Sequence, residues 1–183
     1  TNIEKINSIN TYFSDFEEYS NNPIIEDGNR QYHPCVLYDI NSFGNNINDY
    51  VNGSSGDIYK VRPYYKMWVG QYNGSLYSTE FFYSNDGINW IHPNPGNILS
   101  TQSYHPFVMY NSSNFEDGHK YKMWNWLAND PNKLDYYYSD DGINWTAVSN
   151  GNVYNTKFWN SAPMYSCYVI RKSANNYVGW FED

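Results

Sequence analysis

The chain has 183 residues, 40% hydrophobic and 20% aromatic, which fits one domain with a substantial core but hardly two. Its net charge of −8 disfavours nucleic acid and anionic membrane surfaces as partners, because polyanions repel an acidic chain. The sequence contains no run of about 18 apolar residues, so we expect no membrane insertion.

The N-terminal segment, residues 1–21, carries apolar side chains at a spacing that predicts a short amphipathic helix. From residue 22 onward the chain is organised by an internal repeat, because three sequence blocks occur twice in the same order. A Tyr-His-Pro block is followed by Tyr-Lys-Met-Trp and then by Ser-x-Asp-Gly-Ile-Asn-Trp. The paired blocks are residues 32–38 with 104–110, 65–68 with 121–124, and 82–90 with 137–145.

Each repeat unit is predicted to form four antiparallel strands. The His-Pro block starts the first strand, where proline is tolerated, and Tyr-Lys-Met-Trp alternates as a half-buried second strand does. A third strand leads into an Asp-Gly turn, and Ile-Asn-Trp begins the fourth strand. Four strands per repeat at this spacing are typical of a β-propeller blade.

The repeat divides the chain into two complete units and the start of a third. The first unit is expected over residues 22–96, with a long inserted loop at 41–63 that is rich in Asn, Gly and Ser. The second unit is expected over 97–152, and the third begins in 153–183. Its blocks are placed at Ser161–Tyr165 and Tyr177–Trp180, and no third Asp-Gly block follows.

These blocks resemble the blade pattern of five-bladed propeller glycoside hydrolases, the arabinanase, xylosidase, invertase and levansucrase relatives. The resemblance includes the Asn-Pro-Ile-Ile opening at Asn22–Ile25 and covers about residues 22–183. It implies an all-β, partial five-bladed β-propeller, extracellular or displayed on the cell surface, with carbohydrate as its partner. The Asp-Gly block also resembles, less closely, the Asp-box turn of sialidases, which is structural.

The resemblance further implies acids at or near the start of the innermost strands, since two carboxylates suffice for glycosidic cleavage. The matching positions here are His33, His105, and Asn160 with Ser161, so the usual acids are missing. Two other acids, Glu80 and Asp135, are the candidate catalytic residues, because both are placed at the start of a third strand. The alternative interpretation is that they are solvated strand ends.

The binding candidates are residues expected beside the central funnel. His33 and His105 can bond sugar hydroxyls, or they can simply cap their strands. A metal shared by the two imidazoles is conceivable, but no third ligand is evident, so neither a metal nor another cofactor is expected. The rings of Trp126 and Trp159 do not recur in the repeat and are candidate sugar platforms, together with Asn160 and Ser161. The recurrent tryptophans are expected to pack between units.

Three functions remain open at this point. The first is a carbohydrate-recognising propeller that has lost its acids. The second is an active glycoside hydrolase that uses non-standard acids or acids on missing blades, and the third is a structural or adhesive protein that assembles through its blade faces. Because a closed ring needs more blades than this sequence supplies, we expect further C-terminal blades or a homo-oligomer. Cys35 and Cys167 are compatible with a disulfide or with two buried thiols.

Overall fold

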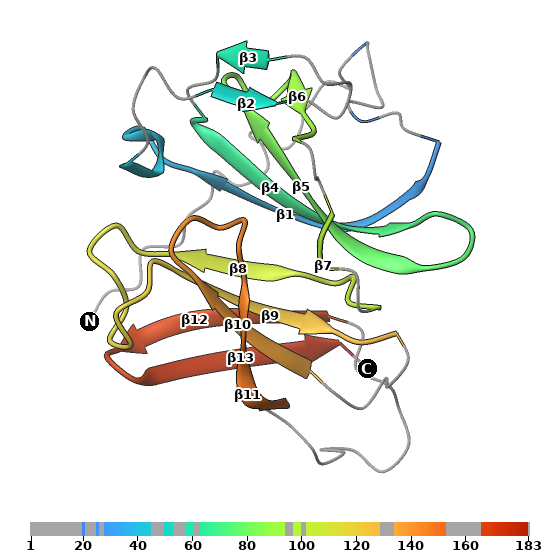
Figure 1. Ribbon diagram of the computed structural model, residues 1–183. Coiled ribbons are helices and arrows are strands. Elements are labelled where there is room, and N and C mark those ends of the chain that lie inside the picture. Colours follow the sequence, from blue (N-terminus) through green and yellow to red (C-terminus); the bar gives the residue numbers. More distant parts are fainter. Residues whose placement is uncertain are drawn as a thin grey trace, which may run out of the picture.

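The computed structural model describes residues 20, 25, 28–44, 50–52, 58–60, 63–93, 97–99, 102–128, 134–152 and 166–182 (Figure 1). In this part of the chain the regular elements are strands, apart from one 3-10 turn, η1 (Ser42–Gly44). No described helix is long and apolar enough to cross a membrane. The predicted all-β class is therefore confirmed, and the helix predicted near the N-terminus lies outside the described residues.

The first repeat unit forms an antiparallel sheet with the strand order β1–β4–β5–β6, in which β7 also pairs with β5. Its strands are β1 (Arg30–Tyr38), β4 (Tyr65–Tyr72), β5 (Tyr77–Ser84), β6 (Trp90–Ile91) and β7 (Asn97–Leu99). The two short strands β6 and β7 pair with different parts of β5 and together take the place of one fourth strand.

The second unit repeats this arrangement in the order β8–β9–β10–β11. Its strands are β8 (Phe107–Tyr110), β9 (Tyr121–Trp126), β10 (Leu134–Ser139) and β11 (Thr146–Asn152). The third unit contributes one hairpin, β12 (Ser166–Ser173) and β13 (Asn176–Glu182), which corresponds to the first two strands of the other units. The predicted four-stranded, antiparallel organisation of the two complete copies is thus confirmed.

Two details of the sequence-based prediction need correction. The inserted segment 41–63 is not a plain loop, because it contains η1 and a separate hairpin of β2 (Tyr50–Asn52) and β3 (Ile58–Lys60). The first block of the third unit is also misplaced in the prediction. Strand register pairs Cys35 with Trp68, Phe107 with Trp124, and Tyr168 with Trp180. Ser166, rather than Asn160 or Ser161, therefore stands where the two histidines stand, and the Ala-Pro at 162–163 misled the alignment.

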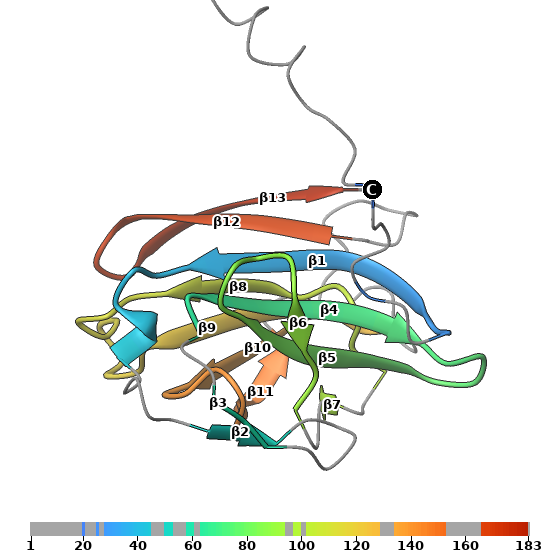
Figure 2. The same cartoon turned by 90° about the horizontal axis from the view of Figure 1, so that it is seen from above.

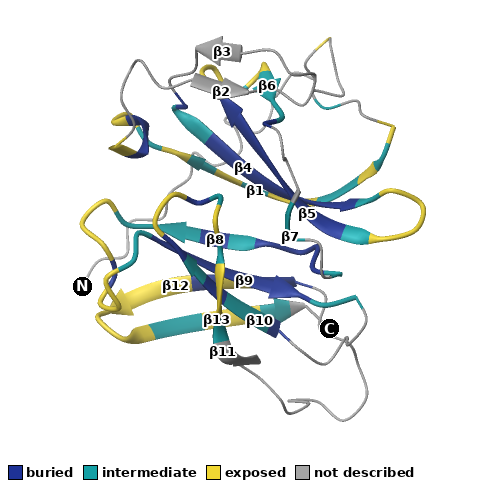
Figure 3. Cartoon of the chain, in the orientation of Figure 1, coloured by how far each residue is buried: buried dark blue, intermediate teal, exposed yellow. Residues whose placement is uncertain are grey.

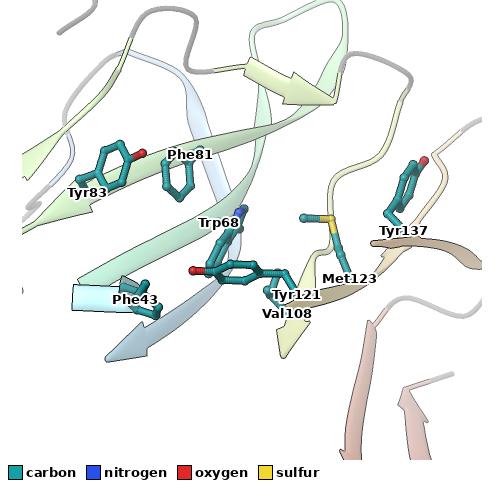
Figure 4. Close-up of a cluster of buried hydrophobic side chains, with 8 residues drawn as sticks. All are labelled: Phe43, Trp68, Phe81, Tyr83, Val108, Tyr121, Met123 and Tyr137. Atoms are coloured by element: carbon teal, nitrogen blue, oxygen red, sulfur yellow. The ribbon is translucent and has the colours of Figure 1, made fainter. Parts of the chain in front are cut away.

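The sheets stack face to face, and alternation along the second strand of each unit determines which face meets which neighbour. In β4, Trp68 points toward the second sheet and is fully buried, whereas Met67 and Val69 lie in a separate cluster on the other face. In β9, Met123 points back toward Trp68 (Figure 4). Trp124 lies on the other face of β9, in a cluster with Cys167 and Val169 of the β12–β13 hairpin. The sheet face that carries the tryptophan of one unit therefore packs on the face of the next unit that carries Met123 in the second unit and Gly179 in the third.

The core between the first two sheets is mainly aromatic and closely packed (Figures 3 and 4). Eight buried side chains form it, four from each unit: Phe43, Trp68, Phe81, Tyr83, Val108, Tyr121, Met123 and Tyr137. Full burial of a large apolar side chain stabilises a fold by about 1.5–3 kcal/mol, so this cluster is a main source of stability.

The Asp-Gly turns have one geometry in both units. The Asp86 Oδ1 accepts backbone N–H groups of Ile88 and Asn89, each at 2.8 Å. In the second unit, the Asp141 Oδ1 accepts the equivalent N–H groups at the same distance. The aspartate thus supplies acceptors that the turn backbone lacks, and glycine follows it at positive φ, which L side chains rarely adopt. Both aspartates are structural, as the sequence predicted.

Candidate functional site

The first strands of the three units, β1, β8 and β12, lie beside one another (Figures 1 and 2). They line a shared cavity, here called the junction cavity. β8 contacts β1 on one side and β12 on the other. The cavity has a volume of about 480 Å³. Its lining consists of Val36 and three equivalent tripeptides, one from each unit: His33–Pro34–Cys35, His105–Pro106–Phe107 and Ser166–Cys167–Tyr168.

The two predicted histidines meet in this cavity. The ring centroids of His33 and His105 are 3.7 Å apart, with the ring planes inclined by 41°. His33 is exposed and sits at a break in the β1–β4 register with φ 47°, in the left-handed region. Such backbone conformations cost about 1–3 kcal/mol at a non-glycine residue and cluster at binding and catalytic sites. The repeat thus brings one exposed and one buried imidazole into contact.

His105 is held by a buried polar network that joins the first two units. Its backbone N–H donates to the Asn125 Oδ1 at 2.9 Å, and the Asn125 Nδ2 donates to the Thr79 Oγ1 at 2.7 Å. The Thr79 hydroxyl in turn donates to the Ser103 carbonyl at 2.8 Å. Thr79, Asn125 and Ser103 are fully buried, so each bond satisfies a group that water does not reach. The network fixes the backbone that carries the His105 ring.

Burial keeps three titratable groups of the junction cavity, His105, Cys35 and Cys167, uncharged near physiological pH. Burial, and secondarily the coulombic effect of the neighbouring His33, lowers the pKa of His105 to about 3. Its imidazole is therefore uncharged and offers one donor and one acceptor. Burial raises the pKa of Cys35 to about 11 and that of Cys167 to about 12, so both thiols stay protonated. Neither cysteine is in a disulfide, which resolves that open alternative.

The predicted catalytic carboxylates lie elsewhere. Glu80 is not at the start of a strand, because β5 begins at Tyr77. Its buried carboxylate accepts the Ser78 hydroxyl at 2.7 Å and pairs with the His92 ring at 3.1 Å, so it is also no solvated strand end. The equivalent Asp135 lies near the start of β10 and accepts the Tyr137 hydroxyl at 3.0 Å. Neither carboxylate lines the junction cavity, and their catalytic role stays a prediction.

The aromatic residues predicted to bind sugar do not lie in the cavity lining among the described residues. Trp126 is buried, with its ring 5.4 Å from that of His105 and 4.8 Å from that of Tyr104. The Trp126 ring therefore packs against the His105 ring, and neither of its faces is accessible to a sugar. Trp159, Asn160 and Ser161 lie outside the described residues. Among the recurrent tryptophans, Trp68 and Trp124 pack between units as expected, whereas Trp180 is 54% exposed.

Two lining residues were missed by sequence reasoning. Tyr168 is 64% exposed and its ring lies 5.9 Å from that of Phe107, so the cavity has an accessible aromatic face. Ser166 adds a hydroxyl at the third histidine-equivalent position. The signal that could have found both is the Tyr-Ser-Cys run at 165–167, which aligns with Tyr-His-Pro once proline is not required.

A second cavity, here called the side cavity, lies between the second sheet and the β12–β13 hairpin. It measures about 250 Å³ and is mainly apolar and aromatic. Its lining residues are Lys122, Trp124, Tyr136, Val169, Tyr177, Gly179 and Phe181. None of these residues was predicted as part of a site, because the repeat treats Lys122 and Trp124 as packing residues.

The polar groups in the lining of the junction cavity are imidazoles, thiols and hydroxyls. Its lining contains no carboxylate, one neutral imidazole and two protonated thiols. Across the part of the chain that the structure describes, no three His, Cys, Asp or Glu side chains gather as a metal site. Comparisons with protein-family models, with curated proteins and with solved structures find no match to the chain. The function proposed below therefore rests on the chain's own residues.

Proposed function

We propose that this chain recognises carbohydrate, binding a neutral sugar in the junction cavity without cleaving it. The observation that carries this proposal is the contact between His33 and the neutral His105 in a cavity whose lining has no carboxylate. Hydrolysis of a glycosidic bond by the usual mechanism requires a pair of carboxyl groups on either side of the bond. Uncharged donors and acceptors, in contrast, suit hydroxyl recognition without chemistry.

The rest of the lining supports a neutral, amphipathic ligand. Ring faces pack on the apolar face of a pyranose or furanose, and the exposed ring of Tyr168 beside Phe107 offers such a surface. The Ser166 hydroxyl and the two imidazoles supply a few polar groups within a largely apolar wall, which is the usual composition of small-molecule sites. The net charge of −8 also disfavours anionic ligands.

As part of this proposal, the sheets are blades of a β-propeller of the partial five-bladed type, secreted or displayed on the cell surface. Three observations support the blade arrangement: the same strand order in both complete units, stacking of successive units in one direction, and first strands that share a cavity. The extracellular location follows from the resemblance of the repeat blocks to secreted glycoside hydrolases.

The test is calorimetric titration of the chain with oligosaccharides of arabinan, xylan, fructan and mannan. The variant Tyr168→Ala removes the exposed ring of the cavity and should weaken binding by about tenfold, equivalent to about 1.4 kcal/mol. The matched control is Tyr38→Ala. Tyr38 is also an exposed tyrosine on a first strand, but it packs on Tyr65 and does not line the cavity.

Binding of one neutral sugar class that Tyr168→Ala weakens and Tyr38→Ala leaves unchanged supports the proposal. Absence of binding across all four polysaccharide classes contradicts it. Release of reducing sugar that Glu80→Gln or Asp135→Asn abolishes also contradicts it, because the chain would then be a hydrolase with non-standard acids.

A further inference from the structure

The side cavity occupies a place that is filled at the other unit interface. Lys122 and Trp124 in its wall are the repeat equivalents of Lys66 and Trp68. Between the first two units, the Asp-Gly turn of the second unit fills this place. There the Trp68 Nε1 donates to the Gly142 carbonyl at 2.8 Å, and the Lys66 Nζ donates to the Asp141 carbonyl at 2.8 Å. The same residue types therefore form a receptor for an Asp-Gly turn at one interface and a cavity at the other.

Trp124 places a hydrogen-bond donor at this cavity. The residue is 7% exposed and lines the cavity. Its Nε1 is not among the described side-chain atoms that are buried without a partner, so the N–H can be reached from the cavity. An indole N–H is a hydrogen-bond donor, and Trp124 can therefore donate to a group that enters the cavity. Gly179 enlarges the space further, since it stands where the other units have Met67 and Met123.

The surface complementary to the side cavity is the Asp86–Gly87 turn of the first unit, between β5 and β6. A Cβ placed on Gly142 would lie 2.9 Å from the Trp68 ring of the neighbouring unit. A Cβ placed on Gly87 would meet only the Tyr65 ring of its own unit, among the described residues. Ile143 is partly buried against the shared core, whereas the equivalent Ile88 is 41% exposed. The Asp86–Gly87 turn thus has the shape and sequence of the docked turn, but no neighbouring unit packs on it within the described part of the chain.

We propose that the side cavity is a docking site for the Asp86–Gly87 turn of a second copy of this chain. The Trp124 Nε1 then donates to the Gly87 carbonyl, as Trp68 donates to Gly142 within one chain. The Lys122 ammonium group already pairs with the Asp117 carboxylate and donates to the Tyr136 hydroxyl at 2.7 Å, so the docking contact depends on Trp124 and on the shape of the cavity. Because the donor turn and the acceptor cavity are different surfaces, the contact is head-to-tail, and copies join into rings or longer chains.

The experiment is sedimentation velocity of the full chain over a range of concentrations. The variant Ile88→Glu adds a charge to the exposed face of the turn, and Gly179→Met fills the cavity with the residue found in the other units. Each variant alone should associate at least tenfold more weakly than the unchanged chain, and should therefore be monomeric at concentrations where the unchanged chain is associated. The control Leu76→Glu changes a comparably exposed side chain on the β4–β5 loop and should leave association unchanged.

Mixing the two blocked variants gives the decisive result. The Gly179→Met chain keeps an intact turn and the Ile88→Glu chain keeps an intact cavity, so an equimolar mixture should form a one-to-one dimer and nothing larger. A monomeric unchanged chain at all concentrations overturns the proposal, as does association that persists in both variants. Circular dichroism of each variant before mixing establishes that it is folded, and Trp124→Phe provides a second acceptor variant that removes only the donor and ring edge.

Discussion

The two interfaces between neighbouring units use the same lysine and tryptophan, but they are closed by different means. Between the first and second units, a turn docks on Trp68 and Lys66 through backbone carbonyls. Between the second unit and the β12–β13 hairpin, the side chain of Glu116 makes the link. Its carboxylate accepts the Tyr177 hydroxyl at 2.6 Å and pairs with Arg171 at 3.0 Å.

This difference shows what the repeat encodes and what it leaves to neighbours. The alternation of Lys66, Met67 and Trp68, repeated in β9, sets the direction in which the units stack. Whether the interface is filled depends on a turn that comes from the next unit along. The β12–β13 hairpin covers the second sheet without supplying that turn, so a cavity of about 250 Å³ remains.

The largest expected effect is a difference in stability between alanine substitutions in the two Asp-Gly turns. Both glycines have a positive φ, 80° at Gly142 and 78° at Gly87, so alanine is strained at either site. At Gly142 the new methyl group would also lie 2.9 Å from the Trp68 ring. We expect Gly142→Ala to lower the free energy of unfolding by about 2–4 kcal/mol and Gly87→Ala by about 1 kcal/mol, as measured by urea denaturation.

Equal losses in the two alanine variants would contradict the comparison. They would mean that the Gly142 turn gains nothing from its contact with Trp68, and that both turns are stabilised only within their own unit. The midpoint of the urea transition and its m-value should be recorded together, because a change in m-value would reflect altered compactness rather than lost stability.

A smaller effect concerns the buried Lys66 at the filled interface. Burial lowers its pKa from 10.5 to about 7, despite the opposing attraction of Asp141. The unfolded chain therefore binds more protons than the folded chain between these values, and the contribution of this group to stability rises with pH across that window. The slope is at most about 1.4 kcal/mol per pH unit.

Substitution of Lys66 by Met should flatten this rise. The measurement is the free energy of unfolding at several values between about pH 7.5 and pH 9.5, below the ordinary ionisation of tyrosine. A Lys66→Met chain that keeps the same slope as the unchanged chain would show that another group produces it. The hydroxyl of Tyr121, which accepts from Lys66 at 3.0 Å, loses its donor in this variant.

Most of the sheet architecture could be predicted from the sequence because it follows from local patterns. The recurrence of the strand and turn blocks identified the four-stranded units, and the Asp-Gly residues identified the turns. The meeting of His33 and His105 was also predictable, since equivalent residues on adjacent first strands occupy equivalent places. These features depend on residue type and spacing alone.

The supporting parts of the site could not be predicted in this way. Asn125 falls within a strand, and only the packing of two sheets reveals that it bonds both Thr79 and the His105 backbone. Glu80 was expected near the histidines because of its position along the repeat. Alternation along β5 instead places it on the same face as Phe82, where it pairs with His92.

The central claim, that equivalent first strands hold two contacting imidazoles in a cavity whose lining has no carboxylate, is tested most directly by NMR of histidine-labelled protein. The structure predicts a nuclear Overhauser effect between the ring protons of His33 and His105, whose centroids are 3.7 Å apart. It also predicts that His105 stays neutral on acidification until its pKa of about 3 is approached or the chain unfolds. No cross-relaxation between the two rings, or a His105 that titrates near its ordinary value of 6.5, would contradict the account.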